Sequence, residues 1–126
     1  MAVKAYLKNA SVSPRKAQVL AALVRGRSVS DALTILEHTP RRSALLVKKT
    51  IASARANAEH NHGYRPDTLM ISEISVTPGA RSRRFRPIAH GQANPFERKT
   101  SNIRVMVDGV KREVKKPATS AKKETK

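Results

Sequence analysis

Six basic side chains and a single acid, Glu97, lie between Pro78 and Ser101. Five of the six are arginines, whose planar guanidinium groups bind phosphate through paired hydrogen bonds and stack on nucleobases. A merely solvated loop would gain nothing from this choice of arginine over lysine. The six basic residues are Arg81, Arg83, Arg84, Arg86, Arg98 and Lys99.

The segment that carries these cations connects two stretches, residues 69–77 and 103–107, in which apolar and polar residues alternate as in strands. A connection this long and this basic does not bury itself in a core. It is either a disordered loop or an arm that becomes ordered against a negatively charged partner.

The internal symmetry of the segment favours the arm. Pro87 and Pro95 lie four residues before and four residues after Gly91. Phe85 and Phe96 fall nearly opposite each other in a ribbon folded about that glycine. We therefore expect a protruding β-hairpin arm, centred on Gly91 and covering about residues 79–101.

The overall charge agrees with a polyanionic partner. The 126 residues include 26 Lys and Arg against 9 Asp and Glu, a formal net charge of +17. Such an excess destabilises the chain by self-repulsion, and nucleic acid is the commonest polyanion that would relieve it. Only four aromatic residues occur (2 Tyr and 2 Phe). We therefore expect recognition of the nucleic-acid backbone and shape rather than base stacking on a sheet.

The arm is expected to project from a small α+β domain. Alternation predicts a strand over 2–9, and caps and apolar spacing predict helices over 14–25, from about 28, and from Thr39-Pro40 to about 61–63. With strands over 69–77 and 102–107, the order is β-α-α-α-β-β. Three helices would cover one face of a small three-stranded, mostly antiparallel sheet.

The third predicted helix has an apolar face of small side chains, which lets it pack closely on a sheet. The residues of this face, spaced by three and four, are Ala44, Val47, Ile51, Ala54 and Ala58. We expect a single domain over residues 1–114, including the arm, and a disordered basic tail over 115–126 that tethers the chain electrostatically.

Cations also stand at the predicted helix starts, where the helix dipole disfavours them. Arg15 and Lys16 follow Pro14, and Arg41 and Arg42 follow Pro40. These cations oppose the helix dipole and gain no local stabilisation from their positions. We therefore expect each pair to hold a phosphate together with the free backbone N–H groups. An ordinary solvated face is the alternative.

Other kinds of chemistry find little support. Cysteine is absent, so disulfides and thiolate metal sites are excluded. His60 and His62 would point apart on a helix, so no metal site is expected, and no cofactor motif or catalytic constellation was found. The longest apolar run is too short to span a membrane, and no signal peptide is recognisable. A soluble, cytoplasmic, non-enzymatic protein is expected.

Several segments together resemble one family. Residues 13–16 (Ser-Pro-Arg-Lys), 25–26 (Arg-Gly), 56–61 (Ala-Asn-Ala-Glu-His-Asn) and the arm with its flanks, 78–103, are similar to the L22 (uL22) family of bacterial large-subunit ribosomal proteins. The resemblance covers about residues 3–108.

The resemblance implies a structural protein, not a homo-oligomer, that binds large-subunit (23S-type) rRNA and supports early subunit assembly on the cytoplasmic ribosome. It implies an arm whose tip lines the nascent-peptide exit tunnel near protein L4. The expected tip residues, on the tunnel wall near the nascent peptide, are Ile88, Ala89, His90, Gly91 and Gln92. The candidate rRNA-binding residues are Lys8, Arg15, Lys16, Arg25, Arg27, Arg41, Arg42, Lys48, Lys49, Arg55, Arg81, Arg83, Arg84, Arg86, Arg98 and Lys99.

Relatives in this family often carry Arg or Lys where this chain has Ile88, His90 and Gln92, so the tip is nearly uncharged here. Two other functional classes are alternatives. A DNA-bending architectural protein would use a β-ribbon arm in the minor groove, should dimerise and should prefer duplex DNA. An RNA-processing enzyme would need a catalytic constellation that the sequence does not offer.

Overall fold

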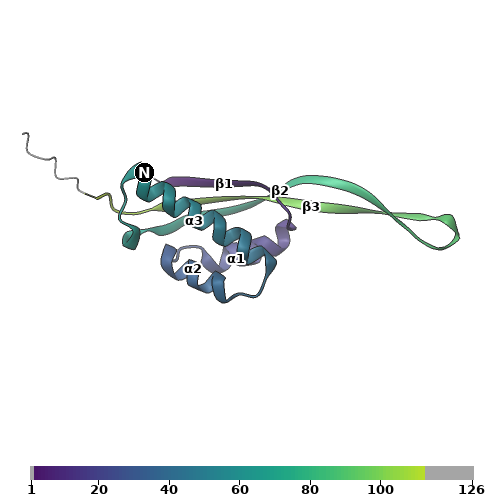
Figure 1. The fold of residues 1–126 in the computed structure, drawn as a ribbon, viewed down its shortest axis with the longest axis horizontal. Helices are drawn as coiled ribbons and strands as arrows, with labels where there is room; N and C mark the ends of the chain where they lie inside the picture. Colours follow the sequence, from purple (N-terminus) through teal and green to yellow (C-terminus); the bar gives the residue numbers. More distant parts are fainter. Residues whose placement is uncertain (1, 113–126) are drawn as a thin grey trace, which may run out of the picture.

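The computed structural model describes residues 2–112 (Figure 1). The sheet has the order β1-β3-β2, and both pairings are antiparallel. The predicted fold class, three helices with a three-stranded antiparallel sheet and a long arm, is confirmed. The predicted tail, 115–126, lies outside the described residues. The elements are β1 (Val3–Ala10), α1 (Pro14–Val24), α2 (Val29–His38), α3 (Arg42–His62), β2 (Met70–Pro87) and β3 (Ala93–Asp108), with short 3-10 turns at Pro66–Thr68 and Ala89–Gly91.

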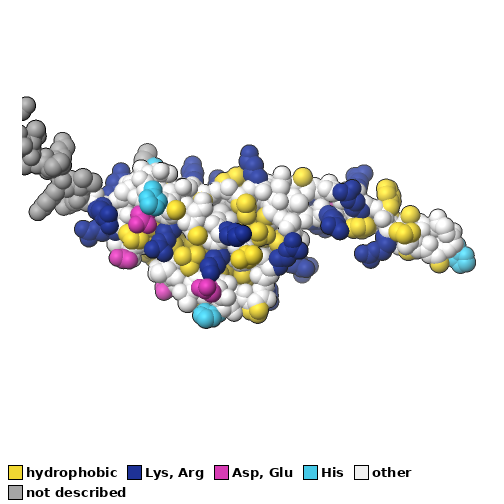
Figure 2. Space-filling view, viewed as in Figure 1, with side chains coloured by type: hydrophobic (Ala, Val, Ile, Leu, Met, Phe, Trp, Pro, Cys, Tyr) yellow, Lys and Arg dark blue, Asp and Glu magenta, His cyan; other side chains and the backbone are white. Residues whose placement is uncertain are grey.

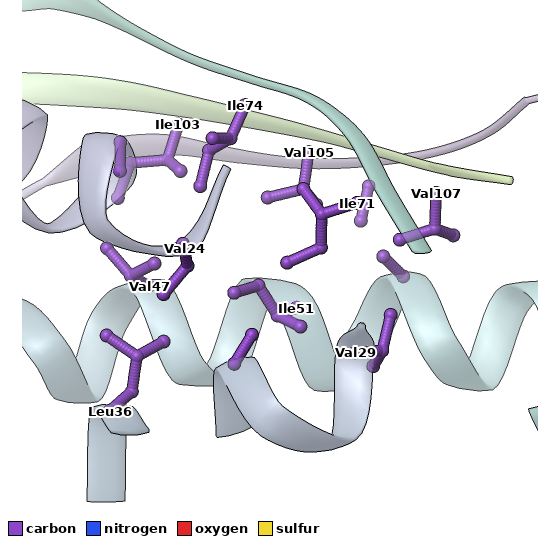
Figure 3. Packing of buried hydrophobic residues seen from close by; sticks show 14 of the residues in the cluster. Val24, Val29, Leu36, Val47, Ile51, Ile71, Ile74, Ile103, Val105 and Val107 are labelled. Carbon is purple, nitrogen blue, oxygen red and sulfur yellow. The ribbon is translucent and has the colours of Figure 1, made fainter. Parts of the chain in front are cut away.

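The core lies between the sheet and the helices. Figure 3 shows Ile51 of α3 beneath Ile71 and Val105 of the sheet, and Val47 further along the same helix. All four side chains are fully buried. Alternate residues of β3 face this core, as the period of two predicts. The α3 face predicted from the sequence is confirmed, because all five of its residues are buried.

The helix boundaries explain one wrong prediction. Thr39-Pro40 does not start α3, which begins at Arg42. The Thr39 hydroxyl instead donates to the carbonyl of Ile35, 2.7 Å away, at the end of α2. Thr39 thus belongs to the end of α2, Pro40 lies in the connection, and Arg41 is the residue that precedes α3.

The other helix ends follow the sequence more closely. Ser28 caps α2 by accepting the N–H of Asp31 at 3.1 Å, as the capping pattern predicts. Ser13 lies at the expected position before α1, but its side chain makes no capping hydrogen bond. Gly63 ends α3 in the left-handed region, with φ of 64°.

The arm is a direct extension of the sheet. β2 and β3 run on past the body, and their pairing continues to Pro87 and Ala93. The centre of the hairpin is His90 rather than Gly91, because residues whose numbers add to 180 are paired from Arg81 outward. His90 has φ of 59° and Gly91 has φ of 70°, so the reversal uses two consecutive left-handed residues.

Register also separates the two phenylalanines of the arm. Phe85 pairs with Pro95, whereas Phe96 pairs with Arg84. Because neighbouring residues of a strand point to opposite faces, the two rings lie on opposite faces of the ribbon. The two residues are one position from opposite each other, close to the expectation, but they do not share a face.

The arm leaves the body at a tightly packed joint. The register shifts on both sides of β3 here, between Pro78 and Arg81 of β2 and between Leu7 and Ala10 of β1. A Cβ on Gly79 would lie 2.6 Å from the Oγ1 of Thr100, so this close approach requires glycine. The Thr100 hydroxyl donates to the carbonyl of Ala80 at 2.7 Å, which fixes the two strands across the bulge.

Candidate nucleic-acid interface

The shaft of the arm carries cations on both faces. Side chains of cross-strand partners share a face, so the register sorts the six basic residues into two sets. Every one of them is exposed. One face carries Arg81, Arg83 and Lys99, and the other carries Arg84, Arg86 and Arg98. A ribbon with three cations on each face is suited to lie between polyanionic segments rather than on the surface of one.

Local contacts hold part of this charge in place. The Arg81 guanidinium lies 3.7 Å from the Glu97 carboxylate, an exposed pair of little energetic weight. The Arg86 guanidinium lies 5.4 Å from the centre of the Phe96 ring. That cation–π contact orients Arg86 along one face of the ribbon while its hydrogen-bond donors remain available.

The tip differs from the shaft in charge. All five predicted tip residues are exposed, and the Ile88 N–H donates to the carbonyl of Gln92 at 2.8 Å to close the turn. On the face seen in Figure 2, Lys and Arg side chains lie along the shaft, and the far end shows a histidine but no Lys or Arg. The tip is therefore a compact polar and apolar knob without permanent charge.

The predicted cations of the body divide into two groups. Some are already engaged within the body: Arg25 donates to the carbonyl of Ile74 at 3.1 Å, Arg27 to that of Leu23 at 3.0 Å, and Lys48 lies 3.1 Å from Glu37. Others are exposed at the surface, among them Arg15, Lys49 and Arg55. Lys48 of α3 is thus already paired with an acid.

Three further predicted residues are brought together at one place. Lys16 of α1 and Arg41 and Arg42 at the start of α3 line the same hollow of about 510 Å³. The sequence indicated two separate phosphate sites, one at each helix start. Folding places the two helix starts beside one hollow.

The open face of the sheet carries Lys8, a candidate from the sequence, and also Lys4 and Arg104, which were not among the candidates. Tyr6 pairs with Arg104 across β1 and β3, and Lys4 and Lys8 flank Tyr6 on the same face. The Lys8 ammonium lies 5.8 Å from the Tyr6 ring centre. The alternation of side chains along β3 places Arg104 beside Tyr6 only when the register between β1 and β3 is known. Arg104 is held at 2.8 Å by Glu73.

Within residues 2–112, no helix is both long and apolar enough to cross a membrane. The same described part contains no group of three or more His, Asp or Glu that could hold a metal ion.

Comparison with known proteins points in one direction. The model of the family described as ribosomal protein L22p/L17e matches residues 5–108. The chain is 45% identical over 104 residues to the large ribosomal subunit protein uL22 of Lactobacillus helveticus, covering 82% of this chain and 89% of the relative. It is 44% identical over 107 residues to the uL22 protein of Oceanobacillus iheyensis, covering 85% of this chain and 95% of the relative.

Proposed function

The chain belongs to the ribosomal protein L22p/L17e family, and from this premise we propose that it binds large-subunit rRNA and tethers distant rRNA segments together. The family consists of ribosomal structural proteins and is not a class of enzymes. Membership makes the chain a protein of the large ribosomal subunit, as the sequence resemblance implied.

The observation that carries the proposal is the two-faced shaft. Between Ala80 and Lys99 only Phe96 is less than exposed, so this segment buries almost nothing of its own. Isolated two-stranded ribbons are marginal in water. Phosphates on both faces would supply the missing stabilisation and would neutralise three cations on each side.

The body would supply the second half of the tether. Arg15, Lys49 and Arg55 are exposed on the helices, far from the arm in sequence. An arm of about 12 residues per strand reaches roughly 40 Å at about 3.3 Å per residue. Body and arm would therefore bind RNA segments that are well separated, which is the physical content of a tethering role in early subunit assembly.

For the tip we propose the tunnel-lining role that the family resemblance implies, near protein L4 and the nascent peptide. An uncharged knob suits a wall that peptides must pass, because it offers no fixed charge to arrest them. Ile88, 41% exposed, gives this knob its apolar part.

Affinity for a large-subunit rRNA fragment, measured against salt concentration, tests the proposal. If about ten phosphates are contacted, log affinity should fall against log salt with a slope of roughly −7 to −9. Duplex DNA of equal length is the control. A slope shallower than about −3, or equal affinity for the duplex, would contradict rRNA tethering.

Sedimentation supplies a second measurement. Tagged protein should remain with large subunits through a high-salt gradient, because contacts on several surfaces must open together before it is released. Recovery of the protein at the top of the gradient, with intact subunits below, would count against the proposal.

A further inference from the structure

We propose that the hollow between the starts of α1 and α3 is a single site for one phosphate group of the rRNA backbone. The inference deepens the proposed function and rests on it. It joins two helix starts that the sequence presented as separate. The polar residues that line the hollow are Ser11, Ser13, Lys16, Arg41, Arg42 and Ser43.

Positive charge converges on this hollow without compensation. Within residues 2–112, none of Lys16, Arg41 and Arg42 forms an ion pair. Arg42 instead donates weakly to the Ser11 hydroxyl, with 3.4 Å between the two atoms. Three cations beside one hollow repel one another, and a bound anion would remove that repulsion.

The two helix starts add some backbone donors. The Lys16 and Ala44 N–H groups already donate to the carbonyls of Ser13 and Arg41. Neither Ser13 before α1 nor Arg41 before α3 makes a side-chain capping hydrogen bond. The first N–H groups of a helix have no partner within the helix, and the dipole favours an anion beside them. The two helices have 11 and 21 residues, long enough for both effects.

Ser43 adds a hydroxyl to the wall of the hollow. The residue is only 6% exposed, yet it lines the hollow. Among the described residues its side chain makes no hydrogen bond, and its oxygen remains accessible, so it can donate to a phosphate oxygen there. Hydroxyl, N–H and guanidinium donors together match the acceptor-rich surface of a phosphate.

A mutant cycle on rRNA binding by the full chain tests whether one phosphate is shared. Lys16→Gln and Arg42→Gln should each lower affinity about 10-fold. The double variant should lose about 10- to 20-fold rather than about 100-fold, because the second cation has nothing left to hold. The salt slope should become shallower by only about 0.7 to 0.9, the contribution of one phosphate.

Two controls accompany the cycle. Arg84→Gln with Arg55→Gln, on the arm and on α3, should combine multiplicatively. Arg65→Gln, beyond the far end of α3, should leave affinity within about 2-fold. Multiplicative loss for Lys16 and Arg42, with a slope change near two phosphates, would overturn the shared site.

Inorganic phosphate distinguishes the pocket from the wider function. At matched ionic strength it should raise the Tm of the wild-type protein and not that of the Lys16→Gln/Arg42→Gln variant. If phosphate acts this way but rRNA affinity is unchanged in the variant, the hollow takes free phosphate and the inference is wrong. If the wild type fails to prefer rRNA while phosphate still stabilises it, the tethering function fails instead.

Discussion

The body and the arm are made from the same two strands, yet they are stabilised in opposite ways. In the body, β2 and β3 bury Ile74, Val76, Ile103 and Val105 against the helices. Beyond Gly79 the same strands carry cations on both faces and have no core. Backbone pairing therefore gives the arm its shape, whereas side-chain burial gives the body its stability. Under the proposed function, rRNA would supply the stabilisation that the arm lacks.

Core truncation should produce the largest difference between the two regions. Ile51→Ala, at a fully buried position of α3, should reduce the free energy of unfolding by about 2–5 kcal/mol. Phe85→Ala in the arm, where the ring is 72% exposed, should change it by less than about 0.5 kcal/mol. Urea denaturation followed by circular dichroism measures both. Similar losses for the two variants would break the distinction between body and arm.

Removing charge from the shaft should show the reverse pattern. The variant Arg83→Gln/Arg84→Gln/Arg86→Gln should bind an rRNA fragment at least about 100-fold more weakly, with a salt slope shallower by about 2–3. Its helical circular dichroism and urea midpoint should match the wild type, since all three side chains are exposed. Unfolding of the body in this variant would show that arm and body are not separable.

Substitutions at the joint test how the body and the arm are connected. Gly79→Ala should destabilise the protein by about 1–3 kcal/mol, because the new Cβ meets the Thr100 hydroxyl at 2.6 Å. Adding Thr100→Ala removes that atom and should recover part of the loss. Thermal unfolding of the single and double variants measures the rescue. An additive double variant would mean that the clash does not govern the joint.

The smallest effect is expected for the only acid of the shaft. Glu97→Gln breaks an exposed pair with Arg81, so stability should change by less than about 0.5 kcal/mol. Affinity for rRNA should rise by about 2- to 3-fold, because a repulsive charge is lost from the interface. A fall in affinity at low salt would indicate that Glu97 positions Arg81 for binding.

The sequence predicted best those structural features that depend on a single helix or strand. The apolar face of α3 follows from helical spacing alone, and it was predicted residue by residue. The start of α3 was missed because a Thr-Pro pair can follow one helix as well as precede the next, and here Thr39 follows α2. The centre of the hairpin was misplaced by one residue because His90 adopts a left-handed conformation that glycine would normally be expected to supply.

The candidate interface was predictable only in its parts. Each basic residue could be named from its neighbours in the sequence, as Lys16 and Arg42 were. Their meeting in one hollow depends on how α1 and α3 pack, which local patterns do not encode. The open-face residue Arg104 was missed for the same reason, because its place beside Tyr6 depends on strand register.

The two cationic faces of the shaft also bear on how long the protein would stay bound to RNA. RNA that contacts both faces of the ribbon encloses it, so the protein cannot leave by sliding off a surface. Its residence time would then be set by how often the surrounding RNA opens, rather than by the strength of any single contact. The same enclosure would make late entry slow, and it favours a ribbon that is already in position while the RNA folds around it.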